Sequence, residues 1–320
     1  MTKKSACLLT GLLLAVSITG IDAGEIHSAC ILTPDAAKVA EILKSGREKI
    51  DDLNETGHSA MHFAARYGFN DCLEVMFSYG ASPDIASRDG ETPAFEAARN
   101  GHLQTLKFLE SKGANLAFRN PKNNRGLLHA AAVESQVEVM DYLLKKGFSS
   151  SDRDKNDDTP LYMVALGSYD DSQKQVEAAR LLLKSGAKVD EASSGGTTPL
   201  IMACGNKNLS FIRFLLENGA NVNWRDNDGG TALHFACLTD NGEVIKLLIS
   251  HGAQVNMADN NYWLPIHSVA AQDNVALAEI LFKAGAKLDV LTHKGLSPLH
   301  LARKRNHLEM IDFLQKHLNK

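Results

Sequence analysis

Two short apolar patterns alternate along most of the chain, and polar turns separate them. The clearest copy lies between residues 231 and 261, where "TALHFAC" predicts a short helix that Thr231 can cap and "TDNG" interrupts it. A second helix follows, and four of its apolar residues are spaced to form one buried face: Val244, Ile245, Leu247 and Leu248. We expect Gly252 to end this helix in a left-handed conformation, and "AQVNMADNN" to form an extended turn.

The same pair of predicted helices recurs with a nearly constant period. The position of His234 is held, in chain order, by His62, Phe95, His129, Tyr162, Ile201, His234, His267 and His300. Successive members are 33 residues apart, except for one interval of 34 and one of 39. Because one helix pair cannot cover its own apolar face, the copies must stack on one another. The period therefore predicts an all-α repeat solenoid of stacked helix–turn–helix units with β-hairpin-like loops.

Short motifs at the start of these units carry a resemblance to a known family. "TPLY", "TPLI", "TALH", "LPIH" and "SPLH" are each followed by small residues and a second helix, and all but the last by "GA". In motif and period the chain resembles the ankyrin repeat. The resemblance implies eight repeats over residues 57–320, with a six-residue insertion in the fourth and the last one acting as a C-terminal cap. "DAAKVAEILKSG" implies a degenerate N-terminal capping repeat at residues 24–56.

The first 23 residues differ from the repeats. A positively charged start, "MTKK", precedes the apolar "ACLLTGLLLAVSITGI", and "IDA" ends in the small residue Ala23. This order is typical of a secretory signal peptide, fits a bacterial one, and predicts cleavage near Ala23. A membrane anchor is the alternative, but the run is shorter than the roughly 20 residues that span a bilayer. We therefore expect an exported protein, periplasmic or secreted, with no membrane segment after cleavage.

Composition and motifs argue against several functions. The chain has 34 basic and 38 acidic side chains and a net charge of -4, with no basic run, so we expect no nucleic acid partner. It contains no phosphate-binding loop, nucleophile elbow, His-Glu-x-x-His helix or Cys-x-x-Cys pair. We expect no enzymatic activity, no cofactor and no metal.

The histidines and cysteines have structural explanations in the repeat pattern. Five of the 12 histidines end the TPLH-like motif, where the resemblance implies hydrogen bonds that hold the turn to the helix. Cys204 and Cys237 take the same position in successive repeats, and Cys72 lies on an apolar helix face. Packed helices lie about 8–10 Å apart, whereas a disulfide needs Cα atoms within about 7 Å. We therefore expect these cysteines and Cys30 to be small core residues without a disulfide.

Partner-binding residues are predicted in the loops, because the arrays that this chain is similar to bind partners on a concave face of first helices and loops. One loop position, usually alanine in the family, carries large side chains in four repeats: Ile85, Phe118, Trp224 and Met257. The next position carries Arg119, Arg153 and Arg225, and a third, four residues before the histidine position, holds Arg125 and Trp263. Large apolar groups beside arginines are typical of interface hot spots. Packing of these groups between neighbouring loops is the alternative.

Together these patterns favour a non-catalytic scaffold, expected to be a monomer, that binds a partner protein on its concave face of loops and inner helices. A dedicated inhibitor, immunity protein or accessory protein of one exported enzyme or toxin is the alternative, and the sequence does not separate the two.

Overall fold

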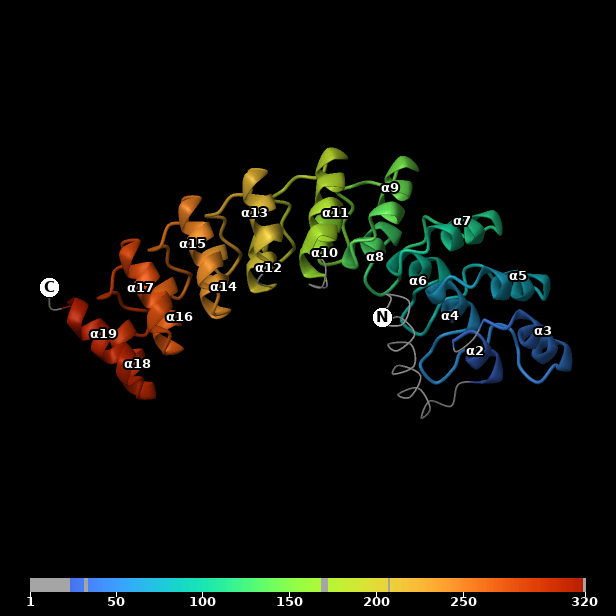
Figure 1. The fold of residues 1–320 in the computed structure, drawn as a ribbon, viewed down its shortest axis with the longest axis horizontal. Coiled ribbons are helices and arrows are strands. Elements are labelled where there is room, and N and C mark those ends of the chain that lie inside the picture. The colour runs from blue at the N-terminus through green and yellow to red at the C-terminus, as the bar shows by residue number, and fades with distance from the viewer. Residues whose placement is uncertain (1–23, 32–33, 168–171, 207, 319–320) are drawn as a thin grey trace, which may run out of the picture. The chain divides into compact units, whose positions relative to one another are not determined.

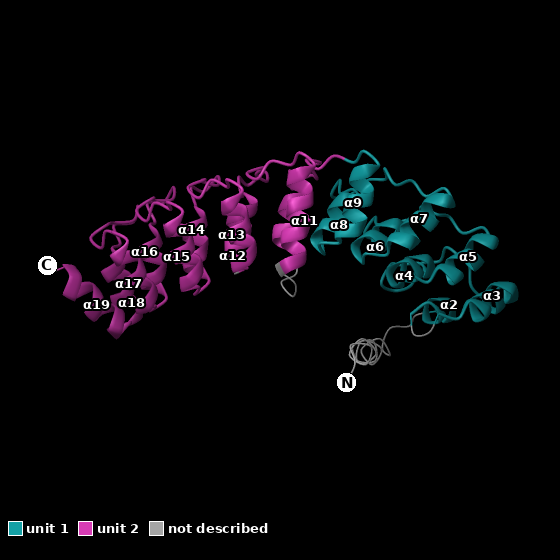
Figure 2. Cartoon of the chain, turned by 45° about the horizontal axis from the view of Figure 1, so that its top comes forward, with its two compact units in different colours: residues 1–148 teal, residues 149–320 magenta. Residues whose placement is uncertain are grey.

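The computed structural model describes residues 24–31, 34–167, 172–206 and 208–318, and within these ranges it holds 18 helices and no strand (Figure 1). The all-α repeat architecture that the period predicts is therefore confirmed. The predicted signal peptide, residues 1–23, lies outside the described residues, as do residues 168–171 in the insertion of the fourth repeat. No helix in the described ranges is both long and apolar enough to cross a membrane. The chain divides into two compact units, residues 1–148 and 149–320 (Figure 2).

Unit 1 consists of two rows of stacked helices. Its helices are α2 (Glu25–Ala29), α3 (Ala36–Ser45), α4 (Ala60–Tyr67), α5 (Asn70–Ser78), α6 (Pro93–Arg99), α7 (Leu103–Ser111), α8 (Leu127–Val133) and α9 (Val137–Lys145). The first helices of successive repeats, α4, α6 and α8, pack against one another. The second helices form the other row, in which α3 packs on α5 and α7 on α9. Each row covers the apolar face that a single helix pair would leave exposed.

Unit 2 repeats this arrangement. Its helices are α10 (Pro160–Leu166), α11 (Ser172–Lys184), α12 (Pro199–Asn206), α13 (Leu209–Glu217), α14 (Ala232–Leu238), α15 (Gly242–Ser250), α16 (Pro265–Ala271), α17 (Val275–Lys283), α18 (Pro298–Arg305) and α19 (Leu308–Leu318). The five first helices stack from α10 to α18, and the five second helices stack from α11 to α19. Helix α11, which follows the predicted insertion, has 13 residues, whereas α13, α15 and α17 have nine each.

Histidines of the TPLH-like motif hold the turn to the helix, and His62, His234 and His267 also join neighbouring repeats. The backbone N–H of Thr231 donates to Nδ1 of His234 at 3.1 Å, and Nε2 of His234 donates to the carbonyl of Trp263 in the next repeat at 3.0 Å. His62 makes the same pair of bonds, to Ser59 at 3.1 Å and to Glu91 at 2.8 Å. The predicted structural role of these histidines is therefore confirmed.

The predicted helix faces also occupy the core. Val244, Ile245, Leu247 and Leu248 of α15 are buried, and the backbone after it turns left-handed at Gly252, with φ of +88°. All four cysteines of the described ranges are buried, which agrees with their expected place in the core.

Helix α3 falls within the segment for which a degenerate capping repeat is predicted. The carboxylate of Asp35 accepts the backbone N–H of Lys38 at 2.9 Å and so caps the start of the helix.

Candidate functional site

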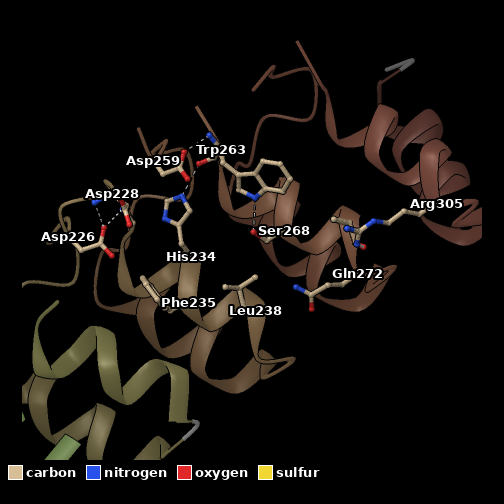
Figure 3. A pocket seen from close by; sticks show the side chains of 12 residues that line it. Asp226, Asp228, His234, Phe235, Leu238, Asp259, Trp263, Ser268, Gln272 and Arg305 are labelled. Carbon is tan, nitrogen blue, oxygen red and sulfur yellow. Dashed lines mark hydrogen bonds between the residues drawn. The ribbon is translucent and has the colours of Figure 1, made fainter. Parts of the chain in front are cut away.

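A pocket of about 440 Å³ opens on the first helices of unit 2 and on the loops that precede them (Figure 3). Its lining comes from α14, α16, the end of α18 and two loops, and consists of Asp226, Asp228, Gly230, His234, Phe235, Leu238, Asp259, Trp263, Ser268, Ala271, Gln272 and Arg305. Apolar, acidic and basic side chains therefore meet in one hollow.

The smallest and the largest residue type occupy the equivalent position in two consecutive repeats of this pocket. Gly230 stands four residues before the histidine position, where every other repeat carries a side chain. A Cβ atom at Gly230 would lie 3.1 Å from Oδ2 of Asp226 and 3.1 Å from the ring of Phe235. The same position in the next repeat holds Trp263, whose Nε1 donates to Oγ of Ser268 at 2.8 Å. The missing side chain therefore lets Asp226 and Phe235 lie close together, and the tryptophan forms a wall of the pocket.

Three carboxylates lie at the loop side of the pocket. Oδ1 of Asp226 accepts the backbone N–H groups of Asp228 at 3.1 Å and of Gly230 at 2.7 Å. In the next loop, Oδ1 of Asp259 accepts those of Asn261 at 2.8 Å and Trp263 at 2.7 Å. These turns fix the orientation of both carboxylates and use only one oxygen of each. Across the described residues, Asp226, Asp228 and Asp259 form no ion pair.

The other side of the pocket is apolar and then basic. Leu238, the last residue of α14, is 58% exposed and in Figure 3 lies between the aspartates and Arg305. Arg305 donates to the carbonyl of Ala271, and no carboxylate of the described ranges lies within ion-pair distance of it. Burial lowers the pKa of His234, so this histidine is neutral at pH 7 and does not offset the aspartates. The pocket therefore runs from three negative charges, across apolar groups, to one positive charge.

A second, smaller pocket adjoins the first at Trp263. It has a volume of about 280 Å³ and shares Asp259 and Trp263 with the larger pocket. Its remaining lining is Asn261, Thr292, His293, Lys294 and Leu296. Tyr262 is 60% exposed and stacks on His293, with 5.9 Å between ring centroids. Aromatic side chains thus concentrate where the two pockets meet.

The loop tryptophan that the sequence singled out contacts the preceding loop. Trp224 is half-buried, and its Nε1 donates to the carbonyl of Gly196 at 2.9 Å. Arg225 beside it is exposed and donates to Oδ1 of Asn260 in the next loop at 3.3 Å. Met257 is half-buried in the loop before α16. These three residues do not line the larger pocket.

The remaining predicted residues also lie along loops. In unit 1, Ile85 and Phe118 are half-buried, and the ring of Phe118 meets Phe95 edge-on at 6.3 Å. Arg119 is half-buried and its Nε donates to Oδ1 of Asn124 at 3.0 Å.

Two arginines complete the predicted set. Arg125 is half-buried in unit 1. In unit 2, Arg153 is exposed and its Nη1 donates to the carbonyl of Ala192 at 3.2 Å.

Of the nine predicted residues, only Trp263 lines either pocket, and the binding role of all nine stays a prediction. Sequence reasoning missed Asp228, Leu238 and Arg305. One signal for them was present in the sequence. Gly230 and Trp263, the smallest and the largest residue type, occupy the equivalent position in two consecutive repeats.

A buried charge cluster in unit 1 contrasts with this pocket. Glu96 of α6 is 1% exposed, and Arg66 of α4 donates to it from Nε at 2.9 Å and from Nη2 at 2.7 Å. Burial alone would raise the pKa of Glu96, but the hydrogen bonds and charge of Arg66 hold it below its usual value. This carboxylate is already paired, so it joins two repeats and leaves no charge for a ligand.

Comparison with known proteins identifies the class. A family model described as ankyrin repeats, three copies, matches residues 26–120, 112–193 and 171–259, and a single ankyrin repeat matches residues 294–319. The chain therefore belongs to the ankyrin repeat family. Such repeats are protein-interaction scaffolds, and the family is generally non-catalytic. In the described ranges no group of three or more His, Cys, Asp or Glu side chains is placed to hold a metal ion.

The chain matches parts of relatives from several kinds of organism. The chain is 30% identical to the potassium channel AKT2/3 of Arabidopsis thaliana, over 50% of this chain and 19% of that protein. It is 29% identical to a putative ankyrin repeat protein of Rickettsia felis, over 38% and 40% of the two chains. It is 27% identical to human SH3 and multiple ankyrin repeat domains protein 2, over 53% and 9%. The matched region spans at most 40% of these three relatives, which come from a plant, a bacterium and an animal.

Proposed function

We propose that this protein is a non-catalytic scaffold that binds a partner protein on its first helices and loops, with the two pockets around Trp263 at the centre of the contact. The observation that carries the proposal is the larger pocket, which places exposed Leu238 beside Phe235 and Trp263 in a family of interaction scaffolds. Buried aromatic and aliphatic anchors supply most of the binding energy of protein interfaces.

The conformation of Tyr262 supports the same location. Its φ is +57°, in the left-handed region, where five of the seven other repeats have glycine. A side chain in this region costs about 1–2 kcal/mol relative to glycine. An exposed aromatic residue kept in such a conformation beside two pockets is consistent with a role in binding.

Affinity capture with matched variants tests the proposal. The tagged full chain serves as bait, and each captured protein is compared between wild type, Leu238→Glu and Leu308→Glu. Leu308 is 64% exposed at the start of α19 and lines neither pocket, so it controls for charge placed on an exposed leucine. We expect a specific partner to be retained by wild type and Leu308→Glu and lost by Leu238→Glu. Equal capture by all three baits contradicts the proposed site.

We also propose that this binding takes place after export. The support is the order of charged start, apolar run and small residue in residues 1–23. Sequencing the N-terminus of the protein made in a secreting host tests this, and a soluble product that begins at Met1 contradicts it.

A further inference from the structure

The two sides of the larger pocket indicate which chemistry it accepts. Asp226, Phe235 and Trp263 line the same pocket. Gly230 lets Asp226 and Phe235 approach closely, because a Cβ atom there would lie only 3.1 Å from each. A group bound in the pocket therefore meets carboxylates and aromatic side chains together. Lysine and arginine side chains satisfy both, through a charge-assisted hydrogen bond and a cation–π contact.

The carboxylates need no rearrangement to bind such a group. Asp226 and Asp259 are each held by two backbone N–H groups on Oδ1, so their second oxygens have a fixed position. The side chain of Asp228, between them in the pocket lining, is exposed. A ligand that meets fixed acceptors loses less free energy in ordering them.

Cations of the chain do not already neutralise this side of the pocket. Arg225 hydrogen-bonds to Asn260 and is outside the lining, Lys294 lines only the smaller pocket, and Arg305 lies on the far side. His234 is neutral at pH 7, as described above. Three carboxylates thus face the pocket without an ion pair among the described residues.

We propose, building on the function proposed above, that the pocket accepts a partner segment in which a lysine or arginine side chain enters between Asp226, Asp228 and Asp259. The apolar residue next to it packs on Leu238. The three carboxylates repel phosphate and other anions, so the occupant is a basic–apolar protein segment and not a phosphorylated or acidic one. Arg305 repels a second cation on the far side and so sets the direction in which the segment lies.

The experiment uses Trp263 as the reporter. The chain has two tryptophans, so Trp224→Phe in the full chain leaves Trp263 as the only indole. The probes are three blocked dipeptides: acetyl-Leu-Arg-amide, acetyl-Leu-citrulline-amide and acetyl-Leu-Glu-amide. Citrulline keeps the shape of arginine and lacks its charge. Each probe is titrated to about 20 mM, a range suited to so small a ligand, while NMR follows the indole N–H of Trp263.

We expect the arginine peptide to bind with a dissociation constant about threefold to tenfold lower than that of the citrulline peptide, and the glutamate peptide to bind most weakly. Raising the salt concentration should reduce the difference between the dissociation constants of the arginine and citrulline peptides, because that difference comes from charge. Equal affinity for the arginine and citrulline peptides, or no saturable shift with the arginine peptide, overturns the proposal.

Two variants and a control locate the effect. Asp228→Asn removes an exposed carboxylate that holds no turn, so it should lower the arginine preference and leave the fold intact. Gly230→Thr introduces the residue that the fifth repeat has as Thr197, and its Cβ atom should displace Asp226 and Phe235 and so lower the arginine preference. Asp289→Asn removes an exposed carboxylate outside both pockets and should change nothing. Loss of preference in Asp289→Asn as well contradicts a local site.

The outcomes separate this inference from the proposed function. If Leu238→Glu abolishes capture of the partner but arginine and citrulline peptides bind equally, the pocket binds protein without selecting a cation. If capture does not depend on Leu238, the proposed site itself is wrong.

Discussion

At the scale of single residues, the buried histidines make folding depend on protonation. Burial lowers the pKa of His62 from 6.5 to about 4, and also lowers the pKa values of His234 and His267. In each case Nδ1 accepts a backbone N–H, so a proton on that nitrogen would break the cap of the helix. The neutral form is therefore the native one.

The folded pKa of His62 is below its unfolded value, so its contribution to stability is complete above pH 6.5 and is lost as the pH falls toward 4. We predict that the free energy of unfolding drops by about 1.5 kcal/mol between pH 6.5 and pH 5 through His62 alone. Urea unfolding at both pH values measures this. His62→Gln should be less stable at pH 7 and should lose less on acidification. Parallel losses in variant and wild type would contradict the assignment.

At the scale of one element, the turn before α16 holds Tyr262 in a left-handed backbone conformation that favours glycine. Tyr262 adopts the conformation that glycine has at residues 57, 90, 196, 229 and 295. We predict that Tyr262→Gly raises the stability by about 0.5–1 kcal/mol, because relief of strain exceeds the loss of stacking on His293. Tyr262→Ala keeps the strain and loses the ring, so it should be less stable than wild type. Thermal melts of the three proteins decide the sign, and a lower melting temperature for Tyr262→Gly would show that stacking dominates.

At the scale of the whole molecule, stability comes from neighbouring repeats. Helix α18 packs on α16, α19 packs on α17, and Phe282 of α17 meets Phe313 and His317 of α19 at 6.2 Å and 4.3 Å between ring centroids. We predict that deleting residues 295–320 lowers the free energy of unfolding by at least about 3 kcal/mol, since each large apolar side chain newly exposed costs about 1.5–3 kcal/mol. Gel filtration should also show association through the uncovered face. A monomeric truncation that melts like the full chain would show that the last repeat is not a cap.

The succession of stacked helix pairs could be predicted from the sequence, whereas the larger pocket could not. Period and motif fixed the helix pairs and the role of His234, because each depends on spacing within 33 residues. The pocket depends on side chains of three repeats, among them Leu238, Trp263 in the next repeat and Arg305 in a third. Trp224 is an unusually large residue for its loop position, which predicts a role in binding, yet its indole hydrogen-bonds to the preceding loop. Comparing equivalent positions of the repeats shows which positions vary. Only the packing in the folded structure shows which of them line a pocket.

The lining of the larger pocket also bears on how such a protein can acquire new partners. Its charged and apolar side chains come from loops and helix ends of three repeats, whereas the stability of the scaffold comes from the stacking of the helices. A lineage of these chains can therefore change what it holds by substitutions in the pocket lining, while the stacked helices that ensure folding are retained.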